Sequence, residues 1–230
     1  MTDSSKRLIK SFVRRAGRIS PRQQQGLDRS LLTYGLILTD KPWDYADLFG
    51  RRREVVLEIG FGMGQSLLTM AMAQPDIDFI GIEVHQAGIG RLAVDLEDHG
   101  VNNVRIAPYD AVDVLQQGIA SASLAGVQIF FPDPWPKARH HKRRLIQPDF
   151  VGLLVDKLKP GGFLHLATDW GAYAAHMYSV LGGNARLTNL APTSGFVSRP
   201  ETRPMTKFEK RGLKLGHKIW DLQFINSNSG

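Results

Sequence analysis

The sequence predicts an α/β fold in which a doubly wound, mostly parallel sheet is covered on both faces by helices. Short apolar segments alternate with segments of helical periodicity along most of the chain. A glycine-rich turn joins the first apolar segment to a helical one, and carboxylates follow successive apolar segments. In open α/β sheets, residues at such positions gather at the edge where ligands bind.

The predicted elements follow in chain order. The strands lie at residues 55–59, 79–83, 104–107, 127–131 and 163–167, with two later ones near 185–190 and 218–224. Helices are predicted between them, for example at residues 65–73, 86–99 and 149–158. Parallel strands joined through helices need right-handed crossovers, so the first and fourth strands are expected to be neighbours where the strand order reverses.

The positive charge is concentrated at the N-terminus. The chain has 230 residues and a formal net charge of +7. Residues 1–53 contain 12 Lys and Arg against 5 Asp, which accounts for all of that charge. We expect a basic, flexible arm over residues 1–45 and one folded domain over residues 46–230. A neutral domain with a basic arm is typical of an enzyme that acts on a polyanion.

The chain has no cysteine. Thiolate zinc sites, iron–sulfur clusters, disulfides and Cys nucleophiles are therefore excluded, and we expect no metal site. No apolar segment approaches the roughly 18 residues of a membrane span, so the sequence predicts a soluble, cytoplasmic protein. The Arg-rich and weakly amphipathic segment 6–18 leaves a mitochondrial transit peptide as the alternative.

The glycine-rich turn predicts a nucleotide pocket. Gly60, Gly62 and Gly64 follow the first strand, where glycine lets the backbone turn tightly and approach a ligand. Their spacing is G-x-G-x-G, and Gln65 stands where a dinucleotide site has its last glycine. Glu58 precedes the turn; its carboxylate would repel a pyrophosphate but could bind a cationic, amino-acid-bearing cofactor. This argues against an NAD oxidoreductase.

Two further carboxylates follow the second and third strands. Glu83 ends the second strand, where a carboxylate can accept hydrogen bonds from both hydroxyls of a ribose. Asp110 follows the third strand, where its side chain can accept a hydrogen bond from the exocyclic amine of adenine. Each alone is more often a solvated residue, but three acids at successive strand ends indicate one ligand site.

Residues 131–137 (FPDPWPK) form the most informative segment of the chain. Three prolines within five residues fix φ and exclude helix, so a stiff loop is predicted after the fourth strand. Since the first and fourth strands are expected to be neighbours, Asp133 should lie across a crevice from the glycine turn. A rigid carboxylate and indole there suit recognition of a flat base. A proline-stiffened surface loop is the alternative.

A basic run follows this loop and could neutralise several phosphates. A solvated surface is the alternative. The run consists of Arg139, His140, His141, Lys142, Arg143 and Arg144.

Together these residues resemble the bacterial tRNA (guanine-N7-)-methyltransferase family. The resemblance covers nearly the whole chain, and its most specific parts are the proline loop and the string T-K-F-E. The matching segments are residues 11–18, 58–64, 131–144, 168–170 and 203–209.

The resemblance implies a class I S-adenosylmethionine-dependent methyltransferase with a Rossmann-like seven-stranded sheet and an antiparallel last strand. It implies methyl transfer from S-adenosyl-L-methionine to N7 of the variable-loop guanosine at position 46 of tRNA, leaving S-adenosyl-L-homocysteine. Asp133 corresponds to the catalytic position and, with Glu58, Glu83 and Asp110, to the cofactor-binding acids. The substrate-binding positions correspond to Lys137, Asp169, Thr206, Lys207, Phe208 and Glu209, and the RNA-binding stretch to residues 139–144.

Two other functions remain open on the residues alone. The fold could methylate an exocyclic amine or a small molecule, in which case activity should not depend on salt. The chain could also be an RNA-binding protein with an inactive pocket, although its pocket acids are intact. We expect a monomer or a weak homodimer.

Overall fold

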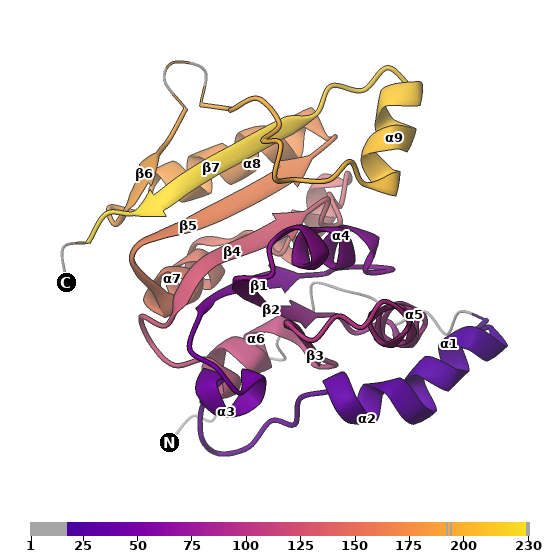
Figure 1. The fold of residues 1–230 in the computed structure, drawn as a ribbon. Helices are drawn as coiled ribbons and strands as arrows, with labels where there is room; N and C mark the ends of the chain where they lie inside the picture. The colour runs from indigo at the N-terminus through magenta and orange to yellow at the C-terminus, as the bar shows by residue number, and fades with distance from the viewer. Residues whose placement is uncertain (1–17, 192, 194, 229–230) are drawn as a thin grey trace, which may run out of the picture.

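The computed structural model describes residues 18–191, 193 and 195–228 (Figure 1). The first 17 residues of the predicted basic arm, including segment 11–17, lie outside the described residues. Among the described helices, none is both long enough and apolar enough to cross a membrane.

A single seven-stranded sheet forms the centre of the molecule, as predicted. Its order is β3-β2-β1-β4-β5-β7-β6, and β7 is antiparallel to both of its neighbours. The pairing of β1 with β4 confirms the expected reversal of strand order. The strands are β1 (Glu54–Ile59), β2 (Ile77–Ile82), β3 (Val104–Ala107), β4 (Leu124–Phe130), β5 (Leu158–Thr168), β6 (Leu187–Asn189) and β7 (Trp220–Asn226).

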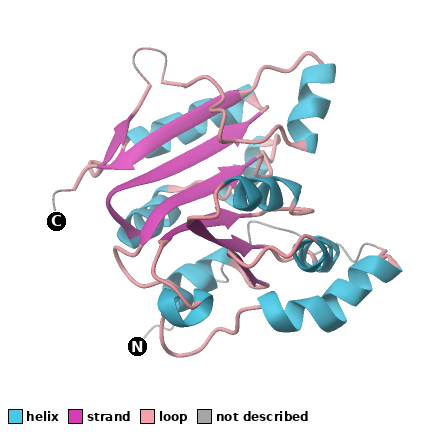
Figure 2. Cartoon of the chain, in the orientation of Figure 1, coloured by secondary structure: helices cyan, strands magenta, loops and turns pink. Residues whose placement is uncertain are grey.

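Helices cover both faces of the sheet (Figures 1 and 2). The central strands are buried on both sides, which explains their continuous apolar sequences. One hydrophobic core lies under α4 (Gln65–Ala73) and α5 (Gln86–Asp98). The second lies under α6 (Ala111–Asp113), η2 (Val114–Gly118), α7 (Pro148–Lys157) and α8 (Gly171–Gly182).

β5 begins earlier than the sequence predicts. The strand predicted at residues 163–167 extends back to Leu158, so residues 159–162 belong to β5 as an irregularity in the pairing. Leu124 pairs with Leu158 and Gly126 with Phe163, so β5 contains extra residues between these pairs. Gly161 adopts φ +75°, which a residue with a side chain rarely adopts.

Residues 18–45 differ from the expected flexible arm, because they pack on the domain. Ser20 forms a capping box at the start of α1 (Pro21–Gln25), which continues as η1 (Gly26–Ser30) and α2 (Leu31–Tyr34). These helices pack on α5, and Arg22 pairs with Asp95 there. α3 (Tyr45–Phe49) begins at the Asp44 cap and contributes to the second core.

Two helices lie at the carboxyl edge of the parallel strands. They are η3 (Ala138–Arg143), which follows the proline loop, and α9 (Lys207–Lys214), which precedes β7. Figure 1 shows α9 beyond the ends of β5 and β4, on the side toward which these strands point. The elements that surround the predicted site therefore meet at one edge of the sheet.

Candidate active site

The glycine turn after β1 has the conformation that its sequence predicts. Gly60, Gly62 and Gly64 adopt φ of 77°, 59° and 76°. A Cβ on Gly60 or Gly62 would meet no atom within 4 Å, whereas one on Gly64 would lie 2.7 Å from the Leu92 side chain. The first two glycines thus border open space, and Gly64 allows close packing on α5.

Glu58 is a buried carboxyl group with an unsatisfied oxygen. Its side chain is 2% exposed, and Oε2 has no hydrogen-bond partner among the described residues. Burial, with a contribution from the nearby charge of Glu83, raises the pKa of Glu58 to about 8. An unpaired buried acid is costly, so this group is suited to a cationic partner.

Glu83 holds the glycine turn against β2. Its Oε2 accepts a hydrogen bond from Gly62 N at 2.9 Å, and its Oε1 accepts from His85 N at 3.0 Å. Val84 N also donates to Oε1, at 2.6 Å, so of the roughly four acceptor positions of a carboxylate one remains, on Oε2, for a hydroxyl group. Asp110 caps α6 through Oδ1, which accepts a hydrogen bond from Val112 N at 2.8 Å; among the described residues, none donates to its Oδ2.

These residues fit S-adenosylmethionine. The turn leaves open space at two glycines, and the unsatisfied Glu58 oxygen suits the cofactor's ammonium group. The acids of β1, β2 and β3 lie together because these strands are adjacent and parallel. The arrangement matches a ligand with a cationic amino acid at one end and a nucleoside at the other.

The proline loop after β4 is strained and braced. Phe131 and Trp135 adopt φ of 53° and 43°, conformations that non-glycine residues rarely adopt and that persist only where the surroundings hold them. Asp133, between them, is exposed. Since β4 pairs with β1, the loop leaves the sheet beside the glycine turn.

Arg144, which the sequence groups with the predicted RNA-binding run, is buried and holds this loop in place. It is 4% exposed, its Nε donates to Pro134 O at 2.9 Å, and its guanidinium lies 4.9 Å from the Tyr173 ring centroid. Burial lowers the pKa of Arg144. The sequence could not separate Arg144 from its basic neighbours, because burial depends on Tyr173 from a distant helix.

The other members of the basic run lie nearer the surface. Arg139 and Lys142 are exposed, and so is Lys137 at the start of η3. Trp135 contacts the run: the Arg143 guanidinium lies 5.1 Å from its ring centroid, and His140 packs edge-on at 5.8 Å. Desolvation and the neighbouring cations lower the pKa of His140.

Asp169, after β5, contacts the chain around α9. Its Oδ2 lies 3.4 Å from His217 Nδ1, and a Cβ on Gly212 would lie 3.1 Å from the same oxygen. Phe208 stacks on Phe131 with ring centroids 6.5 Å apart. α9 therefore connects the Asp169 end of β5 with the proline loop.

Two residues of the T-K-F-E string, Thr206 and Glu209, make contacts within the protein. Thr206 caps α9 by accepting from Glu209 N at 3.1 Å. Glu209 is 3% exposed and pairs with Arg203. Lys207 and Phe208 are exposed.

Arg203 is the centre of a buried network to which the sequence assigned no role. It is 1% exposed and contacts both Glu209 and Asp221, and Asp221 also bonds His165 Nε2 at 2.8 Å. Burial alone would lower the pKa of Arg203, but the hydrogen bonds to these two acids raise it. One sequence signal was present, since His165 interrupts an otherwise apolar strand.

Comparison with known proteins identifies the family of the chain. The family described as "Putative methyltransferase" matches residues 52–222. A tRNA (guanine-N(7)-)-methyltransferase of Legionella pneumophila is 57% identical, covering 95% of this chain and 98% of the relative. One of Idiomarina loihiensis is 53% identical, covering 97% and 91%. One of Pseudomonas savastanoi is also 53% identical, covering 95% and 89%.

Solved structures agree on the fold. The 16S rRNA methyltransferase KamB has a TM-score of 0.55 at 13% identity, covering 82% of this chain and 95% of that one. The [4+2]-cyclase SpnF has the same TM-score at 14% identity, covering 94% and 100%. These proteins share the class I S-adenosylmethionine-dependent methyltransferase fold, and the reaction depends on the site grafted on it. Because these relatives match nearly the whole chain at more than half identity, the chain belongs to the tRNA (guanine-N7-)-methyltransferase family.

Proposed function

We propose that this protein transfers a methyl group from S-adenosyl-L-methionine to N7 of the variable-loop guanosine of tRNA, forming 7-methylguanosine. The observation that carries this proposal is the braced loop that presents the exposed Asp133 beside the glycine turn. The names of the relatives supply the atom that is methylated.

The cofactor supplies an electrophilic methyl group on a sulfonium. Glu58 would accept from the cofactor's ammonium group, because its unsatisfied oxygen is buried beside the glycine turn. The remaining acceptor position of Glu83 would accept a hydrogen bond from a ribose hydroxyl, and Asp110 Oδ2 would accept one from the adenine amine. Gly60 and Gly62 would let the backbone approach the ligand.

Guanine N7 has an in-plane lone pair and no proton, so methyl transfer needs no general base. Catalysis then depends on positioning and electrostatics. Asp133 orients the guanine edge and offsets the positive charge that grows on the purine. Asp169 assists from the β5 edge, where His217 and α9 hold one of its oxygens.

The reacting base must be accessible. N7 lies on an edge that faces RNA's deep groove or a tertiary contact, so the nucleotide must be turned outward or met in a loop. Lys137, Lys207 and Phe208 are exposed around the site and suit contacts with it. Thr206 and Glu209 act through α9, as positioning residues. The RNA backbone would be contacted by the remaining residues of the basic run, which are Arg139, His140, His141, Lys142 and Arg143.

We infer a monomer or a weak homodimer. We infer cytoplasmic action, because tRNA is the substrate. Sedimentation at enzyme concentrations used for assay tests the first inference: an obligate dimer at all concentrations would contradict it.

The direct test measures transfer of labelled methyl from S-adenosylmethionine to a tRNA transcript, followed by nucleoside analysis. A matched transcript carries 7-deazaguanosine, which lacks N7. We expect 7-methylguanosine from the first transcript and no incorporation into the second. Equal incorporation into both would overturn the N7 assignment, and transfer insensitive to salt would favour a small-molecule acceptor.

A further inference from the structure

The outward face of α9 carries four cations and no acid. Lys207, Lys210, Arg211 and Lys214 are spaced at i, i+3, i+4 and i+7, so they form one stripe along the helix. All four are exposed, whereas Glu209 and Gly212, on the opposite side of the helix, are buried. We refer to these four residues as the α9 stripe. The stripe faces away from the domain.

Within the described residues, no stripe cation forms an ion pair. The single acid of α9, Glu209, is buried and paired with Arg203 and Arg199. Cations elsewhere on the surface behave differently: Arg22 and Arg91, for example, both pair with Asp95 on α5. The charge of the stripe is therefore left for an external partner or for solvent.

Repulsion between the stripe cations opposes the helix, whereas Arg211 and Lys214, in its last turn, interact favourably with the helix dipole. Lys207 and Arg211, and likewise Lys210 and Lys214, are like charges at i, i+4, and each such pair costs about 0.2 to 0.5 kcal/mol. Lys207 also stands at the helix N-terminus, where a cation opposes the helix dipole. A polyanionic partner would relieve the repulsion between the stripe cations.

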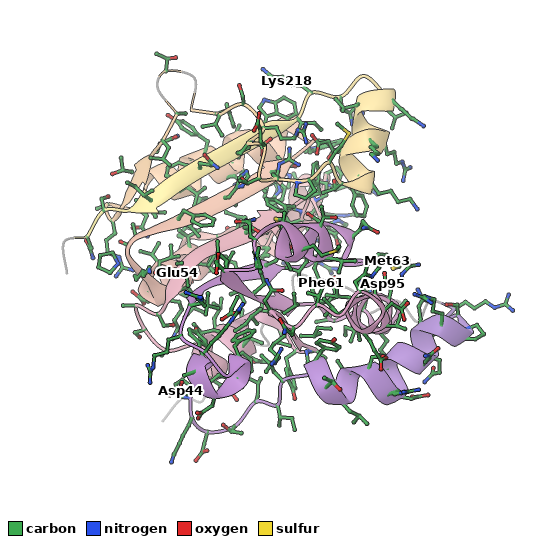
Figure 3. All side chains as sticks on the ribbon, in the orientation of Figure 1. Asp44, Glu54, Phe61, Met63, Asp95 and Lys218 are labelled. Carbon is green, nitrogen blue, oxygen red and sulfur yellow. The ribbon has the colours of Figure 1, made fainter. Side chains whose placement is uncertain are left out.

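The stripe lies at the rim of the candidate active site. Phe208 stacks on Phe131 in the proline loop, and Gly212 contacts Asp169. Lys218 continues the positive charge on the chain that leads from α9 into β7, and its side chain projects outward in Figure 3. A nucleotide held between Asp133 and Asp169 would have its flanking backbone close to α9.

We propose that the α9 stripe binds RNA phosphates next to the target nucleotide, as a second basic surface separate from residues 139–143. This inference rests on the proposed function. From Lys207 to Lys214 the stripe spans about 10 Å, enough to follow a short stretch of backbone. Phosphate contacts add affinity and position the RNA without reading its sequence.

The test compares two variants with equal losses of charge. The first replaces three stripe cations with glutamine: Lys210→Gln, Arg211→Gln and Lys214→Gln. Glutamine keeps the helix propensity near that of lysine. The control replaces three cations at the opposite edge of the sheet, where β1 and β5 begin: Arg52→Gln, Arg53→Gln and Lys159→Gln. A third protein, Lys210→Arg with Lys214→Arg, preserves the charge of the stripe.

The measurement is the Kd for tRNA over a range of salt concentrations. For the stripe variant we expect a slope of log Kd against log salt reduced by about 0.7 to 0.9 per lost contact. Its Kd at low salt should rise at least tenfold, while its Tm is maintained or increased and its Kd for S-adenosylmethionine is unchanged. The control and charge-preserving proteins should keep the wild-type slope.

A wild-type slope for both the stripe variant and the control would assign the stripe to solvent and overturn the proposal. The same loss of slope in both would make it a general effect of net charge and would also overturn it. Failure of the proposed function is distinguishable, because the wild-type protein would then transfer no methyl group to tRNA in the direct assay.

Discussion

Glu58 shows how a functional residue costs stability. Its carboxyl group is buried with one oxygen unsatisfied among the described residues, and burial raises its pKa to about 8 from the usual value near 4.5. The folded protein therefore holds a proton that the unfolded chain releases near pH 4.5. Stability contributed by this group is present below the unfolded pKa and is lost as pH rises through about 8.

Replacing Glu58 should separate stability from cofactor binding. Glu58→Gln removes the ionisation, so it should stabilise the cofactor-free protein at pH 7 by about 3 kcal/mol and raise Tm by several degrees. The same change should weaken S-adenosylmethionine binding at least tenfold, because the anionic acceptor is lost. Thermal unfolding at pH 5 and 7 and a cofactor titration check both effects. A variant destabilised at pH 7 contradicts the raised pKa.

Asp133 is predicted to act on the substrate more than on the cofactor. Asp133→Asn keeps the shape of the side chain but removes the charge that offsets the growing cation on guanine. We expect turnover to fall at least a hundredfold, with the Kd for S-adenosylmethionine changed by less than threefold. Single-turnover methyl transfer and a cofactor titration measure the two quantities. Near-normal turnover would exclude Asp133 from catalysis.

At the scale of elements, the proline loop and η3 form one unit. The Arg144 side chain, at the end of η3, donates to Pro134 O in the loop. Trp135 in the loop contacts Arg143 and His140 of η3. The buried Nη2 of Arg144 has no partner among the described residues, so the bracing has a cost. The loop therefore keeps its two strained residues through contacts with η3 and α8.

Arg144 and Arg139 should differ in their salt dependence. Arg144→Lys loses the bond to the loop, so kcat should fall at least tenfold while the salt slope of tRNA binding stays at its wild-type value. Arg139→Gln removes an exposed charge, and its slope should fall by about 0.7 to 0.9. Steady-state kinetics and binding over several salt concentrations check both. Equal slope losses in the two variants would restore Arg144 as a phosphate contact.

At the scale of the whole molecule, α5 links the N-terminal helices to the cofactor turn. A Cβ on Gly88 would lie 2.0 Å from Gly62 O, and one on Gly90 would lie 2.0 Å from Gln23 O. Gln23 of the N-terminal helices also approaches Met63, beside Gly62, with its Nε2 3.9 Å from Met63 Sδ. The N-terminal helices thus pack on the helix that supports the glycine turn.

Gly90→Ala should disturb the packing of the N-terminal helices on α5. The added methyl group meets backbone, which cannot move as a side chain can, so we expect a loss of about 1 to 3 kcal/mol. Gly152→Ala in α7 is the matched control, because its Cβ would meet nothing within 4 Å and alanine favours helix. Thermal unfolding should show a lower Tm for the first variant only. Equal Tm values would mean that the N-terminal helices can shift freely.

Much of the fold could be predicted because its signals are local. The first five strands were placed close to their observed ranges, since apolar periodicity is a property of each segment. The extra residues in β5 were missed because an irregularity is defined by the partner strand. The packing of residues 18–34 was not predicted, because the positive charge of the N-terminal segment indicated a flexible arm. The close contacts of glycines with α5 form only when the chain folds.

The sequence alone determined the glycine turn, the positions of the pocket acids, the stiff proline loop and the resemblance to the family. These follow from backbone conformation and from residue type at fixed spacing. Only the tertiary structure decided which charged residues face the site. Arg144 and Glu209 look like surface residues in the sequence, yet they are buried against Tyr173 and Arg203. Burial and pairing depend on residues that are brought together only when the chain folds.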